Sequence, residues 1–568
     1  MTFLLVIKIC QCRGLLSDRH SSTEQLVFSC AYTLSHSARQ HALIDYQNTY
    51  VRGKNFFKNV FICVLHVTFK SLMICLYLTF IFSKCIISAA IMVKKQFQLN
   101  PYLLLIISFL GITLVGSFLL SMPWAFRNNP SHEWCHVGNY LDAFFTSLAS
   151  MSLTGFVTYP DGLANTLSLA GQIVVLVLMQ IGGLGAITIL TFLFTTFKRK
   201  LQFKDRLFIS QAIAFNDFSE IARFVRRMMI ITAVCELLGF GLGIPVFFQV
   251  FPNDILKGLY YSLFHSVSAF NNVGFTLFQA NEGLLEGINA ADGVFFDAHH
   301  WLYYYLTFYM AGLSLIGGVS FLVIIDVVFG RKPMRRWSVV TKICLSMTII
   351  MIIFFTVCLY LTDGLKKDNP MNTYEALMQV INCRTAGFSM YPQSDISLPG
   401  RMLCCLMMFI GGAPLSTAGG IKLTTLFVIV LSIISYFRGK RTAVFKRYYS
   451  ESMTAKSLSL VFIVLLLLII SFIALNLFGL KETAEPLNDK IENELITYYL
   501  YEVFSAFSNV GFYTGLESHL STGSLIVLCL LMLLGHLGPM TFFQLFQNHL
   551  DKKANVHYSF VEEDFLIG

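Results

Sequence analysis

Four short glycine motifs in this chain have the residue types to bind a dehydrated cation through backbone oxygens. SAFNNVGF occupies 268–275 and SAFSNVGF occupies 505–512, and two looser copies are SLTGF at 152–156 and RTAGF at 384–388. Backbone carbonyls coordinate potassium when an extended chain turns them inward, and four such loops build a potassium filter. Glycine suits this geometry because it adopts backbone conformations that other residues resist. The motifs therefore predict a cation site lined by carbonyls.

The spacing of the motifs predicts an internal repeat. The shared glycines are separated by 119, 113 and 124 residues, and they are Gly155, Gly274, Gly387 and Gly511. Near-equal intervals indicate four structural units with one copy each. The alternative is that each glycine only permits a tight turn or close helix packing. That alternative does not explain why every copy ends a short amphipathic segment between two long apolar ones.

The elements that must hold the motifs are long apolar segments, each long enough to span a bilayer. We expect eight, in pairs that flank the motifs: 101–124 and 168–197, 226–250 and 301–330, 338–362 and 401–437, and 457–479 and 523–548. The amphipathic segments before the glycines are too short to span: 140–156, 259–275, 374–388 and 498–512. Non-helical backbone at membrane depth is tolerated only inside protein or along a water-filled path. The sequence thus predicts an all-α polytopic membrane protein, with four helix–re-entrant loop–helix repeats around one central pore.

Composition excludes an ordinary soluble protein. Of the 568 residues 55% are hydrophobic and 13% charged, whereas soluble domains have about 25% charged residues. The net charge of +9 is interpreted as a topology signal and not as a nucleic-acid surface. Basic clusters at 94–95, 198–200, 331–336 and 438–447 fall on one side if the spans alternate, which makes that side cytoplasmic. The re-entrant loops then enter from outside.

The repeat predicts four consecutive units, 92–200, 201–335, 336–450 and 451–568, the last with a C-terminal tail. Residues 1–91 match none of them. Met92 is followed by two lysines and a clean apolar run, so we expect the native start there. The alternative is a genuine extra segment with one more apolar span near 71–91.

A second glycine-rich stretch interrupts the apolar run 402–436. It is GGAPLSTAGGIKLTT at 411–425, and it predicts a broken helix with a loop at mid-membrane. Such a loop could act as a gate that opens by a hinge. The alternative is a glycine-rich packing seam. For the smaller clusters GGLG at 182–185 and GGVS at 317–320, helix packing is the favoured interpretation.

Together, SLTGF, SAFNNVGF, RTAGF, SAFSNVGFYTGL and GGAPLSTAGGIK resemble the motifs of the Trk/Ktr/HKT superfamily of potassium transporters, most closely the bacterial Ktr membrane subunit. The resemblance covers about 92–550. It implies a potassium filter at Leu153, Thr154, Gly155, Asn272, Val273, Gly274, Thr385, Ala386, Gly387, Asn509, Val510 and Gly511. It implies an intramembrane gate that comprises Gly411, Gly412, Ser416, Thr417, Gly419, Gly420, Lys422 and His536.

The resemblance also implies partners. Proteins of this type form homodimers in the bacterial plasma membrane and sit on a cytoplasmic ring of nucleotide-binding regulatory subunits. The regulator binds ATP or ADP, and the chain itself is expected to bind no cofactor. Neither GxxxxGK[ST] nor a βαβ unit with GxGxxG occurs in the sequence. Potassium is the transported ion and sodium a candidate activator.

The chain departs from the family pattern in two places. The family usually has an arginine in the last long helix, facing the pore near the gate loop, whereas GHLGPMTFF places His536 there. Arginine stays charged, but histidine with its ordinary pKa of ~6.5 changes charge near neutral pH. We hypothesise a weaker or pH-sensitive electrostatic barrier; the alternative is a neutral histidine packed against the loop. Leu415 replaces a usual glycine and should stiffen the gate turn.

Two other functions are alternatives to a regulated potassium uptake subunit. An ungated monovalent cation channel on the same scaffold differs only in coupling to a regulator. An intramembrane enzyme would need paired catalytic groups inside the spans; HExxH is absent, and the few buried charges do not pair by spacing. Glu236 lies within the third long helix, where ionisable residues are functional candidates by default. It could pair with a basic residue or face a dimer interface.

Overall fold

The chain divides into two units, Met1–Ile91 and Met92–Gly568. The computed structural model describes residues 101–127, 137–159, 162–185, 218–278, 300–330, 333–366, 370–389, 391–414, 416–439, 443–444, 447–448, 451–481, 494–512 and 514–539. All of them belong to the second unit. The predicted start at Met92, the apolar span near 71–91 and Leu415 lie outside the described residues.

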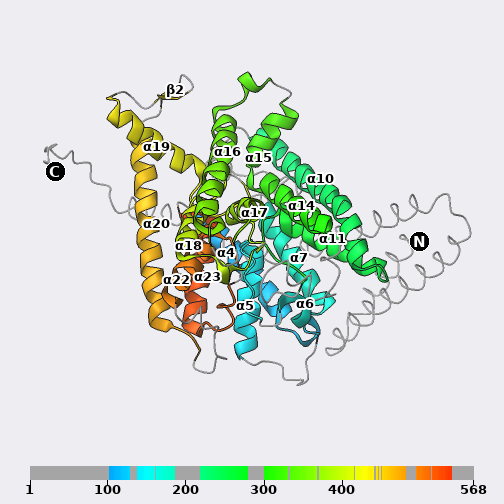
Figure 1. The fold of residues 1–568 in the computed structure, drawn as a ribbon. Helices are drawn as coiled ribbons and strands as arrows, with labels where there is room; N and C mark the ends of the chain where they lie inside the picture. Colours follow the sequence, from blue (N-terminus) through cyan, green and yellow to red (C-terminus); the bar gives the residue numbers. More distant parts are fainter. Residues whose placement is uncertain are drawn as a thin grey trace, which may run out of the picture. The chain divides into compact units, whose positions relative to one another are not determined.

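The regular secondary structure of the described residues is helical except for one two-stranded ribbon (Figure 1). Its first half contains α4 (Pro101–Leu120), η2 (Pro123–Ala125), α5 (Val137–Met151), α6 (Gly162–Thr166), α7 (Leu169–Leu184), α10 (Phe218–Val250), α11 (Ile255–Phe270), α14 (His300–Gly318), α15 (Phe321–Ile324) and η3 (Ile325–Phe329). Its second half contains η4 (Met334–Arg336), α16 (Val339–Leu359), η5 (Tyr360–Gly364), α17 (Thr373–Cys383), η6 (Gln393–Asp395), α18 (Leu398–Phe409), α19 (Leu423–Phe437), the antiparallel strands β1 (Ala443–Val444) and β2 (Arg447–Tyr448), α20 (Glu451–Phe478), α22 (Leu495–Ser508) and α23 (Thr522–Leu537).

Several long helices begin at a serine that caps them. The side-chain oxygens of Ser168, Ser397 and Ser521 accept hydrogen bonds from the third backbone N–H of α7, α18 and α23. A serine at this position satisfies one of the four N–H groups that a helix start leaves unpaired. The same local signal thus opens the second long helix in three of the four predicted units.

The four short amphipathic helices share one packing pattern. Each packs on the long helix before it: α5 on α4, α11 on α10, α17 on α16 and α22 on α20. Each also contacts the helix that follows it, which is α7, α14, α18 or α23. Their residues are largely buried. The short helices therefore form the inner layer of the described unit.

Three helices are long and apolar enough to cross a membrane, within the part of the chain that the structure describes: Arg223–Val250, Val339–Gly364 and Met453–Phe478. A fourth span, Tyr304–Gly318 with Phe321–Phe329, bends by 92° at its break. The expectation of eight long helices is therefore only partly confirmed. The predicted single helix over 301–330 is wrong, because the chain leaves the helix after Gly318 and restarts behind Ser320, which caps α15.

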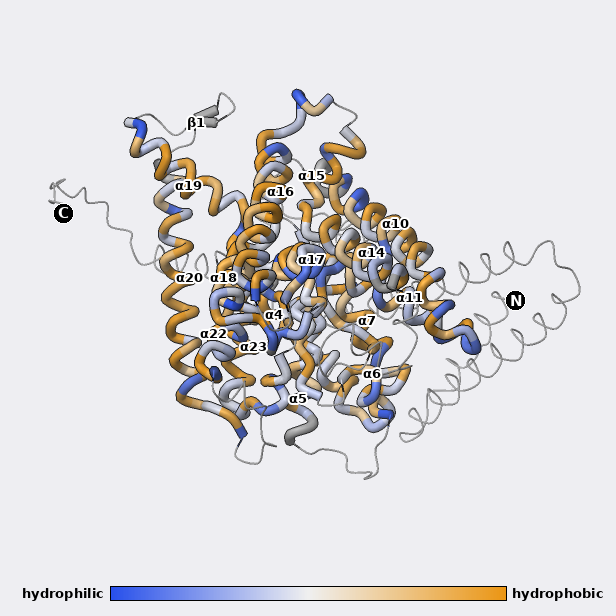
Figure 2. Tube along the Cα trace, in the orientation of Figure 1, coloured by the Kyte–Doolittle hydropathy of each residue, from blue (hydrophilic) through white to orange (hydrophobic). Residues whose placement is uncertain are grey.

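The surfaces of these helices match a lipid environment. Figure 2 shows that α16 and α20 are apolar along most of their length. Large side chains such as Ile353, Phe462 and Ile469 are more than half exposed. A soluble monomer rarely exposes so wide an apolar surface, whereas a bilayer stabilises it.

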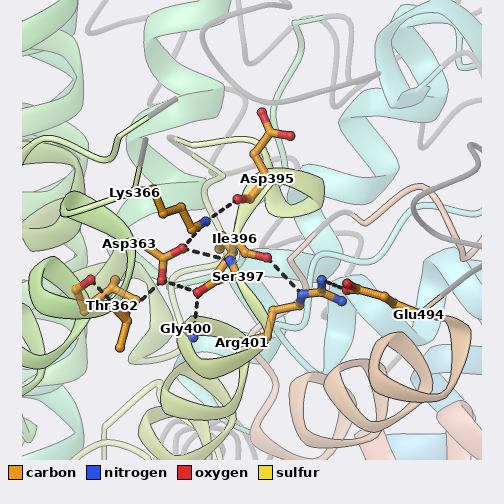
Figure 3. Close-up of polar contacts among 10 residues, drawn as sticks. Thr362, Asp363, Lys366, Asp395, Ile396, Ser397, Gly400, Arg401 and Glu494 are labelled. Atoms are coloured by element: carbon orange, nitrogen blue, oxygen red, sulfur yellow. Dashed lines mark hydrogen bonds and ion pairs between the residues drawn. The ribbon is translucent and has the colours of Figure 1, made fainter. Parts of the chain in front are cut away.

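A polar network joins the third predicted unit to the fourth (Figure 3). The carboxylate of Asp363, at the end of η5, accepts hydrogen bonds from Ser397 N at 2.8 Å and Ser397 Oγ at 3.0 Å, and it pairs with Lys366. Arg401 of α18 donates to Thr497 Oγ1 at 2.8 Å and forms an ion pair with Glu494. These contacts tie η5, which continues α16, to the start of α18, and the start of α18 to the start of α22.

Candidate cation site and gate loop

The four glycine motifs share an unusual backbone conformation. Among the described residues, four that are not glycine have positive φ, and they are Leu153 (60°), Asn272 (56°), Thr385 (72°) and Asn509 (54°). Each lies two positions before a motif glycine, and these glycines have φ of 71–85°. Positive φ costs a non-glycine residue about 1–3 kcal/mol and persists where the surroundings impose it. The strain is most marked at Thr385, which is β-branched.

The alternation of left-handed and ordinary backbone conformations along each motif decides which way its carbonyls point. In a regular strand, successive carbonyls face opposite sides. In each motif a left-handed residue is followed by an ordinary residue and then by a left-handed glycine. This order turns successive carbonyls toward the same side, which a carbonyl-lined filter needs. The ordinary middle residues are Thr154, Val273, Ala386 and Val510, and all of them are buried.

The motifs contact one another in a closed ring. A Cβ added to a motif glycine would meet the carbonyl oxygen of the middle residue in the next motif: Gly155 meets Val273, Gly274 meets Ala386, Gly387 meets Val510, and Gly511 meets Thr154. The fourth contact returns to the first motif. Only glycine fits these positions, since a side chain would displace a neighbouring carbonyl. Sequence spacing predicted the four copies, and the structure brings all twelve predicted filter residues together.

Side chains of the motifs hold the ring in place. Ser505 Oγ accepts hydrogen bonds from Gly511 N at 3.0 Å and Phe512 N at 3.3 Å. Asn509 Nδ2 donates to Ser152 O and Thr154 Oγ1, both at 2.9 Å, and so links the last motif to the first. The short helices end directly before the ring, and the partial negative charge of a helix C-terminus stabilises a nearby cation.

The smaller glycine clusters allow the second helices to approach the ring. A Cβ on Gly182 would overlap the carbonyl of Met151, and a Cβ on Gly317 would overlap that of Phe270. Each carbonyl lies two residues before a left-handed residue. The packing interpretation of these clusters is therefore confirmed.

The predicted gate segment is a non-helical loop between α18 and α19. Gly411 N donates to Ile421 O at 3.0 Å, and Ile421 N donates to Phe409 O at 3.2 Å, so the two ends of the loop lie side by side. Gly420 has φ of 72°. Lys422 Nζ donates to Ala418 O at 2.6 Å. The predicted interruption of the long apolar run is confirmed.

The loop touches two motifs of the ring. Thr417 Oγ1 donates to Gly317 O at 3.1 Å. It also lies 3.3 Å from the side-chain amide of Asn272, which satisfies its hydrogen bonds best with its oxygen facing Thr417. On the other side, a Cβ on Gly419 would lie 2.5 Å from Ser508 O. Ser416 Oγ donates within the loop to Ala413 O at 2.7 Å, and Leu423 N donates to Gly412 O at 3.1 Å. The loop thus reaches the second and fourth motifs.

His536 makes its hydrogen bond outside the gate loop. Its Nδ1 lies 2.9 Å from Ser152 O of the first motif, and its ring lies tilted against that of Phe109, with 5.2 Å between the ring centroids. A carbonyl only accepts, so Nδ1 carries the proton. Lys422 is close enough to interact with His536 electrostatically. Helix position alone could not reveal the contact with Ser152, since it depends on how α23 is rotated.

Comparisons with known proteins show what the chain is similar to. The family profile described as "TrkH: Cation transport protein" matches residues 138–558. "Potassium/sodium uptake protein NtpJ" of Enterococcus hirae is 28% identical over 481 residues, which cover 83% of this chain and 98% of that protein. "Ktr system potassium uptake protein B" of Vibrio alginolyticus is 29% identical over 451 residues, covering 77% and 89%. The crystal structure of the potassium transporter TrkH from Vibrio parahaemolyticus superposes with a TM-score of 0.55 at 17% identity, covering 79% of this chain and 86% of that one.

Proposed function

The chain belongs to the TrkH cation transport protein family, and from this we propose that it is the ion-conducting subunit of a potassium uptake system in a bacterial membrane. Four helix–loop–helix units surround one pore. Potassium enters from the outside through the carbonyl ring, passes the loop at 411–422 and reaches the cytoplasm. The family is one of transport proteins, so an enzyme is not supported.

The main support for the proposal is the closed ring of four motifs, in which left-handed and ordinary backbone conformations alternate. A ring of this kind can replace the hydration shell of a cation with carbonyl oxygens. The names of the relatives, which specify potassium or potassium and sodium uptake, support potassium as the ion. One of these names also specifies sodium uptake, which supports sodium as a second transported ion; we propose in addition that sodium acts as an activator.

Regulation is assigned to a partner. The relative described as part of a "Ktr system" supports assembly with further subunits, and we propose a homodimer on a cytoplasmic ring that binds ATP or ADP. The loop at 411–422 contacts the second and fourth motifs and would transmit the state of the regulator. An ungated channel is less well supported because this loop is hydrogen-bonded to Gly317 and Asn272 and packs against Ser508.

Complementation tests the proposed function. The full chain is expressed in a bacterium that lacks potassium uptake, with and without a co-expressed regulator, and growth at low potassium is measured. We expect rescue that is stronger with the regulator. No rescue by protein that is shown to be in the membrane, with any regulator, would contradict potassium uptake. Equal rescue without a regulator would favour the ungated channel.

A permanent positive charge at position 536 is expected to slow potassium uptake. It would add to the charge of Lys422 and oppose a passing cation. His536→Arg should therefore be slower than the wild type at both pH 8 and pH 6, while the wild type, whose histidine lies against Phe109 and donates to Ser152 O, should keep the same rate at both. Uptake of labelled potassium in cells of equal expression measures this, and equal rates for the two proteins would contradict it.

A further inference from the structure

Glu236 is a buried carboxylate in the middle of α10. Its side chain has two amide partners: Gln180 Nε2 of α7 donates to Oε2 at 3.2 Å, and Asn271 Nδ2 donates to Oε1 at 3.1 Å. Among the described residues, no lysine, arginine or histidine forms an ion pair with it. The basic partner considered from the sequence is therefore not found there, and the carboxylate acts as an acceptor on both oxygens.

Asn271 connects this carboxylate to the carbonyl ring. It follows α11 as its C-terminal cap, and the next residue is Asn272, the left-handed non-glycine residue of the second motif. Asn271 Nδ2 also donates to Val267 O at 3.0 Å. A Cβ on Gly183 would overlap Asn271 Oδ1, so α7 closes the remaining side of the amide. The Nδ2 group of Asn271 is thus hydrogen-bonded, while its Oδ1 faces α7 without a hydrogen-bond partner among the described residues.

The backbone of α10 is tied to α11 at the same place. Ser266 Oγ donates to Glu236 O at 2.7 Å. Removing the Glu236 acceptor would leave buried N–H groups on Gln180 and Asn271 without their partner, and each unpaired buried donor costs about 1–3 kcal/mol. A rotation of Asn271 that regained a partner would move the start of the second motif. Ionisable groups at membrane depth are expensive and are functional candidates by default.

We propose that Glu236 is a positioning residue for the cation filter. Through Asn271 it sets the orientation of the Asn272 and Val273 carbonyls, and with it the preference for potassium over sodium. The proposal rests on the proposed function, since it assigns selectivity to the same ring. The fourth motif does not need such a residue, because Asn509 contacts its neighbour motif directly.

The test compares potassium and sodium uptake by full-length variants in the complemented bacterium. Glu236→Leu should lower the potassium-to-sodium uptake ratio about tenfold. Glu236→Gln should keep most of it, because the Gln180 amide can rotate its oxygen toward the new amide group. Asn271→Leu should match Glu236→Leu, and the double variant should lose no more than either, since residues that act through one contact are not additive.

The matched control is Thr232→Val, one turn earlier on the same face of α10. Thr232 is buried and its hydroxyl has no hydrogen-bond partner among the described residues, so the ratio should not change. An unchanged ratio in Glu236→Leu, additive losses in the double variant, or an equal loss in Thr232→Val would each overturn the proposal.

A second readout separates this proposal from the proposed function. If the wild type takes up no potassium, the proposed function fails, and the thermal stability of the purified full chain in potassium and in sodium still reports on the ring. An ion that binds only the folded state raises stability with its concentration. Greater stabilisation by potassium in the wild type, lost in Glu236→Leu, supports the positioning role. Equal behaviour of the two proteins overturns it.

Discussion

Gly511→Ser is expected to lower the potassium-to-sodium uptake ratio at least tenfold and to prevent growth at low potassium. A Cβ at Gly511 would overlap the carbonyl oxygen of Thr154, so the substitution displaces a group of the ring itself. The positive φ of 72° adds about 1–2 kcal/mol of backbone strain for an L-residue. Uptake of the two ions at equal membrane expression measures the effect.

Gly515→Ser is the matched control for this prediction. Gly515 also has positive φ, 83°, but a Cβ there would have no atom within 4 Å. The backbone strain is thus similar while the overlap with a carbonyl is absent. We expect a small loss of thermal stability and an unchanged ion ratio. If Gly515→Ser loses selectivity as fully as Gly511→Ser, backbone strain and not ring geometry explains both.

Shortening the predicted gate loop, 411–422, is expected to raise the rate of potassium uptake about tenfold and to remove its proposed dependence on a regulator. The change deletes 413–417 and joins Gly412 to Ala418. A Cβ on Gly412 would touch that of Ala418, so the two ends already lie close together. The deletion removes the bond from Thr417 to Gly317 while the filter stays intact. A tenfold rate change corresponds to about 1.4 kcal/mol of barrier, similar to one or two hydrogen bonds.

Thr417→Val tests the same contact without shortening the chain. It removes the hydroxyl bonds to Gly317 and Asn272 and keeps the shape of the side chain, so a smaller increase in uptake is expected. Ion selectivity should stay at the wild-type value in both variants, because neither replaces a motif residue and the contacts between the motifs remain. A shortened loop that slows uptake in correctly inserted protein would mean that the loop supports the pore and does not obstruct it.

The sequence predicted most of the local features of the candidate site. Gly155, Gly274, Gly387 and Gly511 were recognised from type and spacing alone, since few other residues accept their backbone conformation. The broken helix at 411–422 was recognised because glycine, proline and polar residues interrupt an apolar run. The spans were predicted less well: the segment 301–330 bends by 92° within its glycine cluster, although its composition is that of a continuous helix.

The sequence by itself determined the four motifs, the apolar segments that flank them and the position of the gate loop, because these depend on residues close together in the chain. Only the tertiary structure decided which glycine faces which carbonyl. It also decided that His536 bonds to Ser152, 384 positions away, and that Glu236 holds Asn271, 35 positions away. These contacts depend on how each helix is rotated against its neighbours. Apolar helices have similar patterns on many faces, so packing in three dimensions selects the rotation and local sequence does not.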